Sequence, residues 1–121
     1  MTECKVNTQT QDIFSGLWVE NPQEWVNHIM KFVKSANGLD EIEHKTRKSE
    51  HKEARQWHIF LANAILGWPY ARAGGLYGKD HATAMHAKRT ILNLVEVDKF
   101  FKEKYADVIR ECKEYNSRIF I

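Results

Sequence analysis

The sequence predicts an all-α protein, a compact helical bundle that contains a helix-turn-helix. Its 121 residues include only two prolines, apolar side chains recur at spacings of three and four, and runs of β-branched residues are few. Hydrophobic residues at 43% and charged residues at 28% are ordinary for a globular domain with one core. We expect a partly flexible N-terminal extension over residues 1–20 and a single helical domain over residues 21–121.

The first helix of this domain is expected over Pro22–Ser35. Proline tolerates the first turn of a helix, and the residues that follow place apolar side chains along one wide face. Asn37-Gly38 is a natural stop, because glycine readily adopts the left-handed conformation found just past helix ends. A short helix over Asp40–Lys45 is expected next, followed by a basic loop or frayed helix start over Thr46–Lys52.

The second long helix is expected to run from Ala54 to the sequence Gly67-Trp68-Pro69. Apolar residues between positions 57 and 65 recur at the spacing of one helical face. Proline disfavours the α conformation of the residue before it, so the helix should end there.

A helix-turn-helix is expected to follow. Tyr70–Leu76 forms its first helix, Tyr77-Gly78 the turn, and Asp80–Val95 the second helix, whose positive N-terminus suits the Asp80 carboxylate. In the second helix, alanine and aliphatic residues fall within one arc, and a small, polar and basic face lies opposite. This second face has the composition that a groove-binding helix needs. An amphipathic helix over Asp98–Tyr115 completes the predicted bundle.

Charge is distributed unevenly along the chain. Residues 44–90 hold nine basic and three acidic residues, a net charge of +6, whereas the rest holds nine basic and thirteen acidic residues, a net charge of −4. This polarity suits a surface that meets phosphates on one side and solvent elsewhere. The alternative is that the charges only solvate a face of the protein.

The most specific motif is the run Tyr77-Gly78-Lys79-Asp80-His81-Ala82-Thr83-Ala84-Met85-His86-Ala87. It resembles the signature of the C-terminal DNA-binding domain (domain IV) of the bacterial chromosomal replication initiator DnaA. In that family an aromatic-Gly-basic turn leads into Asp-His-x-Thr, and His-Ala follows inside the recognition helix. Upstream, Arg47 falls where the family has a basic-loop arginine, and Arg55-Gln56 matches the family's Arg-Gln pair.

The resemblance implies a Trp-repressor-like helix-turn-helix fold and double-stranded DNA as the partner. It implies that Arg47 enters the minor groove, and that Asp80, His81 and Thr83 lie in the major groove. An aspartate can accept from a cytosine amine, a histidine can donate to a purine or a phosphate, and a threonine offers hydroxyl and methyl contacts. The candidate DNA-binding residues are Arg47, Lys48, Arg55, Gln56, Lys79, Asp80, His81, Thr83, His86 and Arg89.

Each of these residues also has a structural alternative. Taken alone, Asp80 is better explained as a helix cap, and His81 suits a hydrogen bond within the bundle equally well. Arg55 could pair with Glu50 or Glu53 along its helix. The loop cations could be solvated. The joint spacing of the motif residues is what favours DNA binding.

The resemblance also bears on the role of the protein. Ala82 stands where the family has the first threonine of Asp-His-Thr-Thr, which leaves the recognised sequence open. We expect a stand-alone DNA-binding domain without the family's ATPase domain, acting in replication-origin marking or transcription regulation, on a host, phage or mobile-element replicon. The alternative is an interaction module that kept the scaffold and modulates replication or transcription factors. A patch around Trp18 and Trp25, or a homodimer or protein contact through the N-terminal helices, would favour that alternative.

Other functional classes are not indicated. No apolar run approaches the ~18–20 residues of a membrane span, and the start lacks a signal-peptide pattern. Cys4 and Cys112 are isolated, so we expect reduced thiols in a cytoplasmic, nucleoid-associated protein. His81 and His86 point about 140° apart on a helix, which disfavours a metal site. The sequence shows no nucleophile–base pair and no carboxylate dyad, so we do not expect an enzyme. We expect no cofactor.

Overall fold

The structure is a computed structural model that describes residues 22–115. Within this range the chain forms six helices and no strand, which confirms the all-α fold class. The helices are α2 (Pro22–Ala36), α3 (Ser49–Ala64), α4 (Tyr70–Gly75), α5 (His81–Val97), α6 (Lys99–Lys104) and α7 (Ala106–Tyr115). The predicted extension over residues 1–20, including Trp18, lies outside the described residues.

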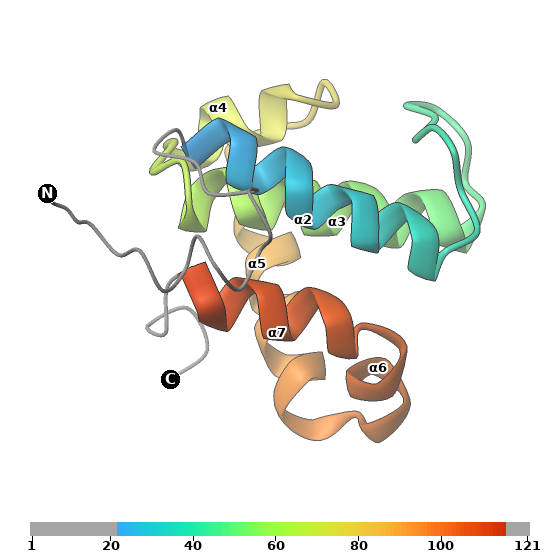
Figure 1. The fold of residues 1–121 in the computed structure, drawn as a ribbon. Coiled ribbons are helices and arrows are strands. Elements are labelled where there is room, and N and C mark those ends of the chain that lie inside the picture. The colour runs from blue at the N-terminus through green and yellow to red at the C-terminus, as the bar shows by residue number, and fades with distance from the viewer. Residues whose placement is uncertain (1–21, 116–121) are drawn as a thin grey trace, which may run out of the picture.

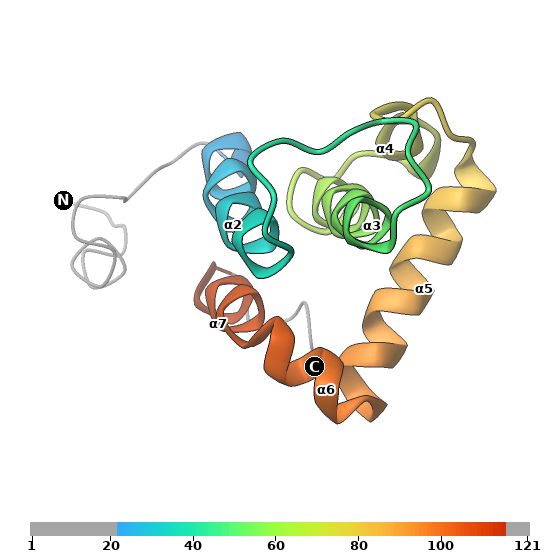
Figure 2. The same ribbon diagram turned by 90° about the vertical axis from the view of Figure 1, so that its right-hand side faces the viewer.

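The helices are arranged around α3, which contacts α2, α4 and α5. Figure 1 shows α2 and α3 running side by side, and Figure 2 shows α3 nearly end-on between its three neighbours. From α4 the long helix α5 carries the chain to α6, and α7 then turns back to pack against α2. In Figure 1, α2 begins and α7 ends on the left, whereas the loop over residues 37–48 lies on the right.

The main core surrounds Trp57, which is fully buried in α3. Its ring stacks on the ring of Phe101, with centroids 5.9 Å apart, and lies 5.1 Å from the ring of Tyr105. Helix α2 contributes Val26 and Ile29, both fully buried, to the same core. The apolar faces predicted for these three parts of the chain therefore meet at one tryptophan.

A second, smaller cluster of buried residues joins α3, α4 and α5 and consists mostly of alanine. Its members are Ile59, Ala62, Ala73, Ala84 and Ala87. Because the distance between helix axes depends on the side chains at the contact, these small residues let α5 approach α3 and α4 closely.

The helix predicted over Asp40–Lys45 is wrong, because this segment is part of a loop that extends to Lys48. Side chains of α3 instead satisfy backbone groups of this loop. The Glu43 amide donates to Nδ1 of His51 at 3.0 Å. Arg55 donates to the carbonyl oxygen of the same glutamate and, at 2.7 Å, to that of Thr46. The sequence predicted either a basic loop or a frayed helix start over Thr46–Lys52. In the structure, helix α3 begins within this segment, at Ser49.

The single final helix predicted over Asp98–Tyr115 is also wrong, because the chain breaks at Tyr105 into α6 and α7. The Tyr105 backbone leaves the helical range, at φ −108° and ψ 25°. Its buried hydroxyl donates to Oε1 of Glu53 at 2.6 Å and accepts from Nδ2 of Asn37 at 2.9 Å. The break turns α7 toward α2, where Nε2 of His28 lies 2.8 Å from Oε1 of the buried Glu111.

Candidate nucleic-acid interface

The turn between α4 and α5 is built on two glycines. Gly78 has φ +68°, a conformation that L side chains rarely adopt. The Lys79 amide donates to the Gly74 carbonyl at 2.9 Å and the Gly78 amide donates to the Gly75 carbonyl at 3.2 Å, which is a Schellman ending for α4. A Cβ atom added at Gly74 would lie 2.6 Å from the Asp80 carbonyl oxygen. The start of α5 therefore rests directly on the α4 backbone.

Asp80 caps α5, as its structural alternative predicted. Its Oδ1 accepts from the Thr83 amide at 2.9 Å and from the Thr83 hydroxyl at 2.8 Å. These hydrogen bonds hold the pKa of the exposed Asp80 carboxyl below its ordinary value. Thr83 donates its hydroxyl hydrogen to Asp80. The lone pairs of the Thr83 hydroxyl oxygen therefore remain free to accept from a donor outside the protein.

The loop over residues 37–48 is held against α3 by the hydrogen bonds of His51 and Arg55. His51 is buried, and its Nε2 lies 3.6 Å from a carboxylate oxygen of Glu43. The Arg55 guanidinium donates to the loop carbonyls of Glu43 and Thr46 and to neither Glu50 nor Glu53. The loop that carries Arg47 is thus bonded to α3 in the free protein.

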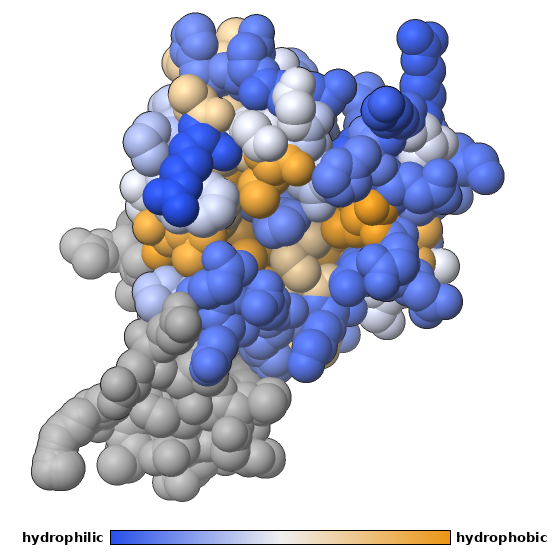
Figure 3. Space-filling view, turned by 90° about the horizontal axis from the view of Figure 1, so that it is seen from above, coloured by the Kyte–Doolittle hydropathy of each residue, from blue (hydrophilic) through white to orange (hydrophobic). Residues whose placement is uncertain are grey.

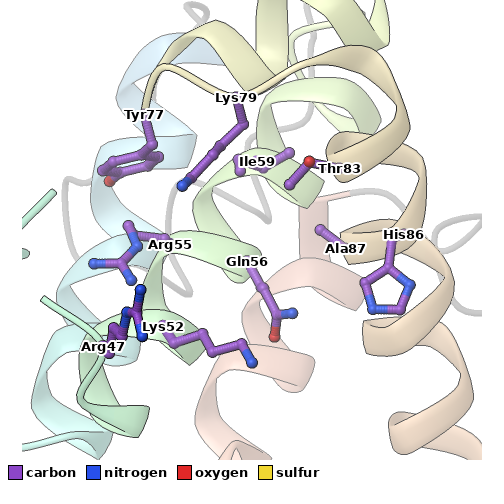
Figure 4. Close-up of a pocket in the computed structure, with 10 residues that line it drawn as sticks. All are labelled: Arg47, Lys52, Arg55, Gln56, Ile59, Tyr77, Lys79, Thr83, His86 and Ala87. Atoms are coloured by element: carbon purple, nitrogen blue, oxygen red, sulfur yellow. The ribbon is translucent and has the colours of Figure 1, made fainter. Parts of the chain in front are cut away.

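A cavity of about 430 Å³ opens between this loop, α3 and the first half of α5. We call it the basic groove. It is lined by Arg47, Lys52, Arg55, Gln56, Ile59, Tyr77, Lys79, Thr83, His86 and Ala87. Figure 4 shows Arg47, Arg55 and Tyr77 on one wall and Thr83, Ala87 and His86 on the other.

The basic groove holds four permanent cations and no carboxylate. Within the described part of the chain, no acidic side chain pairs with Arg47, Lys52 or Lys79. The positive charge of these cations is therefore not neutralised by neighbouring carboxylates, and the groove attracts anions.

Six of the ten predicted site residues line the basic groove, and four do not. The six are Arg47, Arg55, Gln56, Lys79, Thr83 and His86. Lys48, Asp80, His81 and Arg89 lie outside it and are exposed. On α5, Thr83 and His86 face the groove, His81 lies on the other flank of the helix, and Arg89 points outward. The structure therefore brings six of the predicted residues together at the groove and leaves His81 on a different side of α5.

The sequence reasoning missed three residues that the structure places at this surface: His51, Lys52 and Tyr77. Lys52 and Gln56 are four apart on α3, as are His51 and Arg55, so helical spacing could have paired them once the helix start was known. No local signal identifies Tyr77 as a groove residue, because its position depends on how the turn meets the loop.

Residues 22–115 contain no group of three or more histidine, cysteine, aspartate or glutamate side chains that could hold a metal ion. In the same range, no helix is both long and apolar enough to cross a membrane.

The chain matches the family described as the bacterial dnaA protein helix-turn-helix over residues 26–91, more than half of its length. The chain belongs to this family. The matched DnaA-type region runs from α2 into α5 and includes every residue that lines the basic groove. No solved structure matches the chain.

Individual DnaA relatives agree with this assignment. The chain is 37% identical over 86 residues to the chromosomal replication initiator protein DnaA of Flavobacterium psychrophilum, which covers 69% of this chain and 18% of that protein. It is 37% identical over 68 residues to the Bacteroides thetaiotaomicron protein of the same name, covering 55% of this chain and 14% of the relative. It is 30% identical over 93 residues to the Acinetobacter baumannii protein of the same name, covering 76% of this chain and 19% of the relative. The chain spans less than a fifth of the length of these relatives.

Proposed function

We propose that the chain binds double-stranded DNA in a sequence-selective manner through its DnaA-type helix-turn-helix. The observation that carries this proposal is the basic groove, where cations from a loop, a helix and a turn lie beside the exposed start of α5. Such a concentration of unpaired cations beside an exposed helix suits a phosphate backbone on either side of a DNA groove.

In the proposed complex α5 enters the major groove and the loop reaches the minor groove. Asp80, His81 and Thr83 are exposed at the start of α5 and would contact base edges. Arg47 is exposed on the loop, and a narrow minor groove attracts arginine. The other predicted residues, Lys48, Arg55, Gln56, Lys79, His86 and Arg89, are assigned to the phosphates, which set the register of the protein on DNA. Lys52 joins them because its ammonium lines the same groove.

Titration of a fluorescent duplex tests the proposal directly. With the five lysine and arginine side chains assigned to phosphates, affinity should fall about five-hundredfold between about 50 and 200 mM salt, because bound counterions are released. Selection of bound duplexes from a random pool should recover a consensus sequence. One recovered half-site indicates a monomer on DNA, and paired sites indicate a dimer. No binding to any duplex at low salt would overturn the proposal.

Single substitutions separate base contacts from phosphate contacts. His81→Ala should reduce the preference for the selected duplex over random DNA by about 1–3 kcal/mol. Lys52→Ala should weaken binding to both duplexes alike. It should also reduce the slope of log affinity against log salt concentration by about one. Lys102→Ala is the matched control, because Lys102 is exposed on α6, outside the basic groove. Equal effects of His81→Ala on both duplexes would remove His81 from the base contacts.

We further propose that the sites of this protein lie at a replication origin, and that the protein resides in the cytoplasm on the nucleoid. The support is that its relatives are named chromosomal replication initiator proteins. Regulation of transcription from the same sites is the alternative role. Mapping of the occupied sites on the replicon distinguishes the two roles. Binding at the origin gives one cluster of sites, whereas binding at promoters gives dispersed sites.

A protein-binding role is the second candidate. Val97 and Phe100 are 67% and 82% exposed where α5 meets α6. The patch expected around Trp25 does not support this role, because Trp25 is buried. Figure 3 shows that apolar areas on the face above α4 are separated by hydrophilic side chains. Absence of duplex binding together with a concentration-dependent mass in solution would favour this candidate.

A further inference from the structure

Tyr77 connects three elements of the candidate interface. It lies in the turn before α5, and its hydroxyl is 2.7 Å from Nδ1 of His58 on α3. Its ring meets the ring of His44, on the loop, edge-on with centroids 4.8 Å apart. The ring of His58 lies 5.5 Å away on α3. One half-buried side chain therefore touches the loop, the helix beneath it and the turn.

These contacts join the two parts of the protein that are assigned to opposite DNA grooves. His44 is three residues before Arg47, and Tyr77 is three residues before Asp80. The loop is bonded to α3 through His51 and Arg55, and Tyr77 adds a contact from the loop to the turn. The loop and the turn are therefore in direct contact through the ring of Tyr77.

At neutral pH the protonation states of Tyr77 and His58 suit a hydrogen bond between them. Burial raises the pKa of the Tyr77 hydroxyl to about 12, so it remains a protonated donor at neutral pH. Burial, followed by the charges of Lys34 and His44, lowers the pKa of His58, which favours the neutral imidazole that can accept from Tyr77.

We propose that Tyr77, through His44 and His58, is a positioning residue that couples the Arg47 loop to the recognition helix, so that both approach DNA as one preorganised unit. The DNA part of this inference rests on the proposed function, whereas the coupling itself is a property of the free protein. Preorganisation raises affinity because less conformational freedom is lost on binding.

Amide hydrogen exchange in the free, full-length protein tests the coupling without DNA. Tyr77→Ala should speed exchange of the Glu43 and Lys48 amides, which are hydrogen bonded within and beneath the loop. His44→Ala should reciprocally speed exchange of the Lys79 amide in the turn. Core amides of α2 should be unchanged in both variants. Effects confined to the segment that carries the substitution would overturn the coupling.

A double-mutant cycle on the selected duplex tests the consequence for binding. Tyr77→Ala should weaken binding about tenfold in the wild type but less than about twofold in the Arg47→Ala background, because its effect passes through the loop. Tyr77→Phe keeps the ring contact to His44 and should stay within about threefold of the wild type. Tyr70→Ala, at a half-buried tyrosine of α4, is the control and should give the same loss in both backgrounds.

The outcomes separate the two proposals. Equal fold-losses for Tyr77→Ala in both backgrounds indicate a merely structural role and overturn the inference. If the wild type binds no duplex, the proposed function fails, and the reciprocal exchange experiment alone decides whether Tyr77 couples the loop to the turn.

Discussion

Arg55 shows how one side chain can satisfy a family pattern and still do more than the pattern implies. The Arg-Gln pair predicted a phosphate contact, and Arg55 does line the basic groove. In the free protein, however, its guanidinium already donates to two carbonyl oxygens of the loop. Arginine presents several N–H groups in a fixed planar fork, so it can hold the loop and still offer a donor to a phosphate.

Arg55→Lys separates these two roles. Lysine keeps the charge that a phosphate contact needs, but its ammonium cannot reproduce the planar fork that spans the Glu43 and Thr46 carbonyls. We expect Arg55→Lys to lose most of the affinity lost by Arg55→Ala, about tenfold or 1.4 kcal/mol, in duplex titrations. If Arg55→Lys binds like the wild type, the charge alone matters and the loop contacts do not.

His58 predicts a pH dependence of stability. Its folded-state pKa is lowered from 6.5 by burial, then by Lys34 and His44, with the Tyr77 hydroxyl as its hydrogen-bond partner. The unfolded chain therefore binds the proton more readily. The contribution of His58 is complete above about pH 6.5 and is lost as the pH falls through the lowered pKa, at up to about 1.4 kcal/mol per pH unit.

His58→Gln isolates this contribution, because glutamine keeps an acceptor for Tyr77 but does not titrate. Denaturant unfolding of both proteins above and below pH 6.5 gives the measurement. The free energy of unfolding should fall less steeply with acid in the variant than in the wild type. Identical pH profiles would show that His58 does not titrate differently in the folded and unfolded states.

At the scale of elements, the α4–turn–α5 unit could be predicted from the sequence almost to the residue. Its boundaries depend on local signals: Pro69 before α4, Gly78 in the turn and Asp80 as the cap. The loop after α2 and the break at Tyr105 could not be predicted. They depend on Arg55 and other side chains distant in sequence, which override local helix preference.

The same distinction applies to the candidate site. The motif pointed to candidate residues at the start of α5 and to the cations of the loop, because a family motif is read from residues that are close in sequence. The roles of His51 and Tyr77 depend on tertiary contacts with Glu43 and His44. Neither contact follows from a periodic pattern in the sequence, so these contacts of the loop could not be predicted.

The close approach of α4 to the turn makes Gly74 a sensitive position. A Cβ there would lie 2.6 Å and 2.9 Å from the carbonyl oxygens of Asp80 and Lys79. Gly74→Ala should therefore cost about 1–3 kcal/mol in unfolding free energy and displace the start of α5, with weaker duplex binding. Chemical denaturation and duplex titration provide the two measurements.

Gly75→Ala is the matched control for this substitution. Gly75 lies in the same helix, and a Cβ at this position meets nothing within 4 Å. Since alanine favours helix more than glycine, this variant should be neutral or stabilised by up to about 1 kcal/mol. Equal destabilisation of both variants would show that the contact with Asp80 is not the cause.

At the scale of the whole molecule, Trp57 joins the half that carries the basic groove to the half made by α6 and α7. Its ring meets Phe60, Phe101 and Tyr105, so the core is continuous between them. The groove residues on α3 are attached to the same helix. The domain should therefore unfold as one cooperative unit.

Trp57→Ala should destabilise the whole domain by about 3–5 kcal/mol, because it empties a fully buried site. Trp68→Ala is the control, because Trp68 is half-buried and its ring centroid lies 3.9 Å from Cζ of Arg72. The loss of Trp68 should lower the free energy of unfolding by less than half as much as the loss of Trp57. Unfolding followed by circular dichroism and by fluorescence should give coincident transitions in the wild type. Separate transitions would show that the two halves unfold independently.

The positions of the first and last described helices have a practical consequence. Because α2 begins and α7 ends on the side away from the 37–48 loop, a fluorophore attached at the first turn of α2 or the last turn of α7 would lie away from the proposed DNA-binding surface. Labels at these two helix ends should therefore leave duplex affinity equal to that of the unlabelled chain. A tag inserted within the loop itself should obstruct the approach of the duplex.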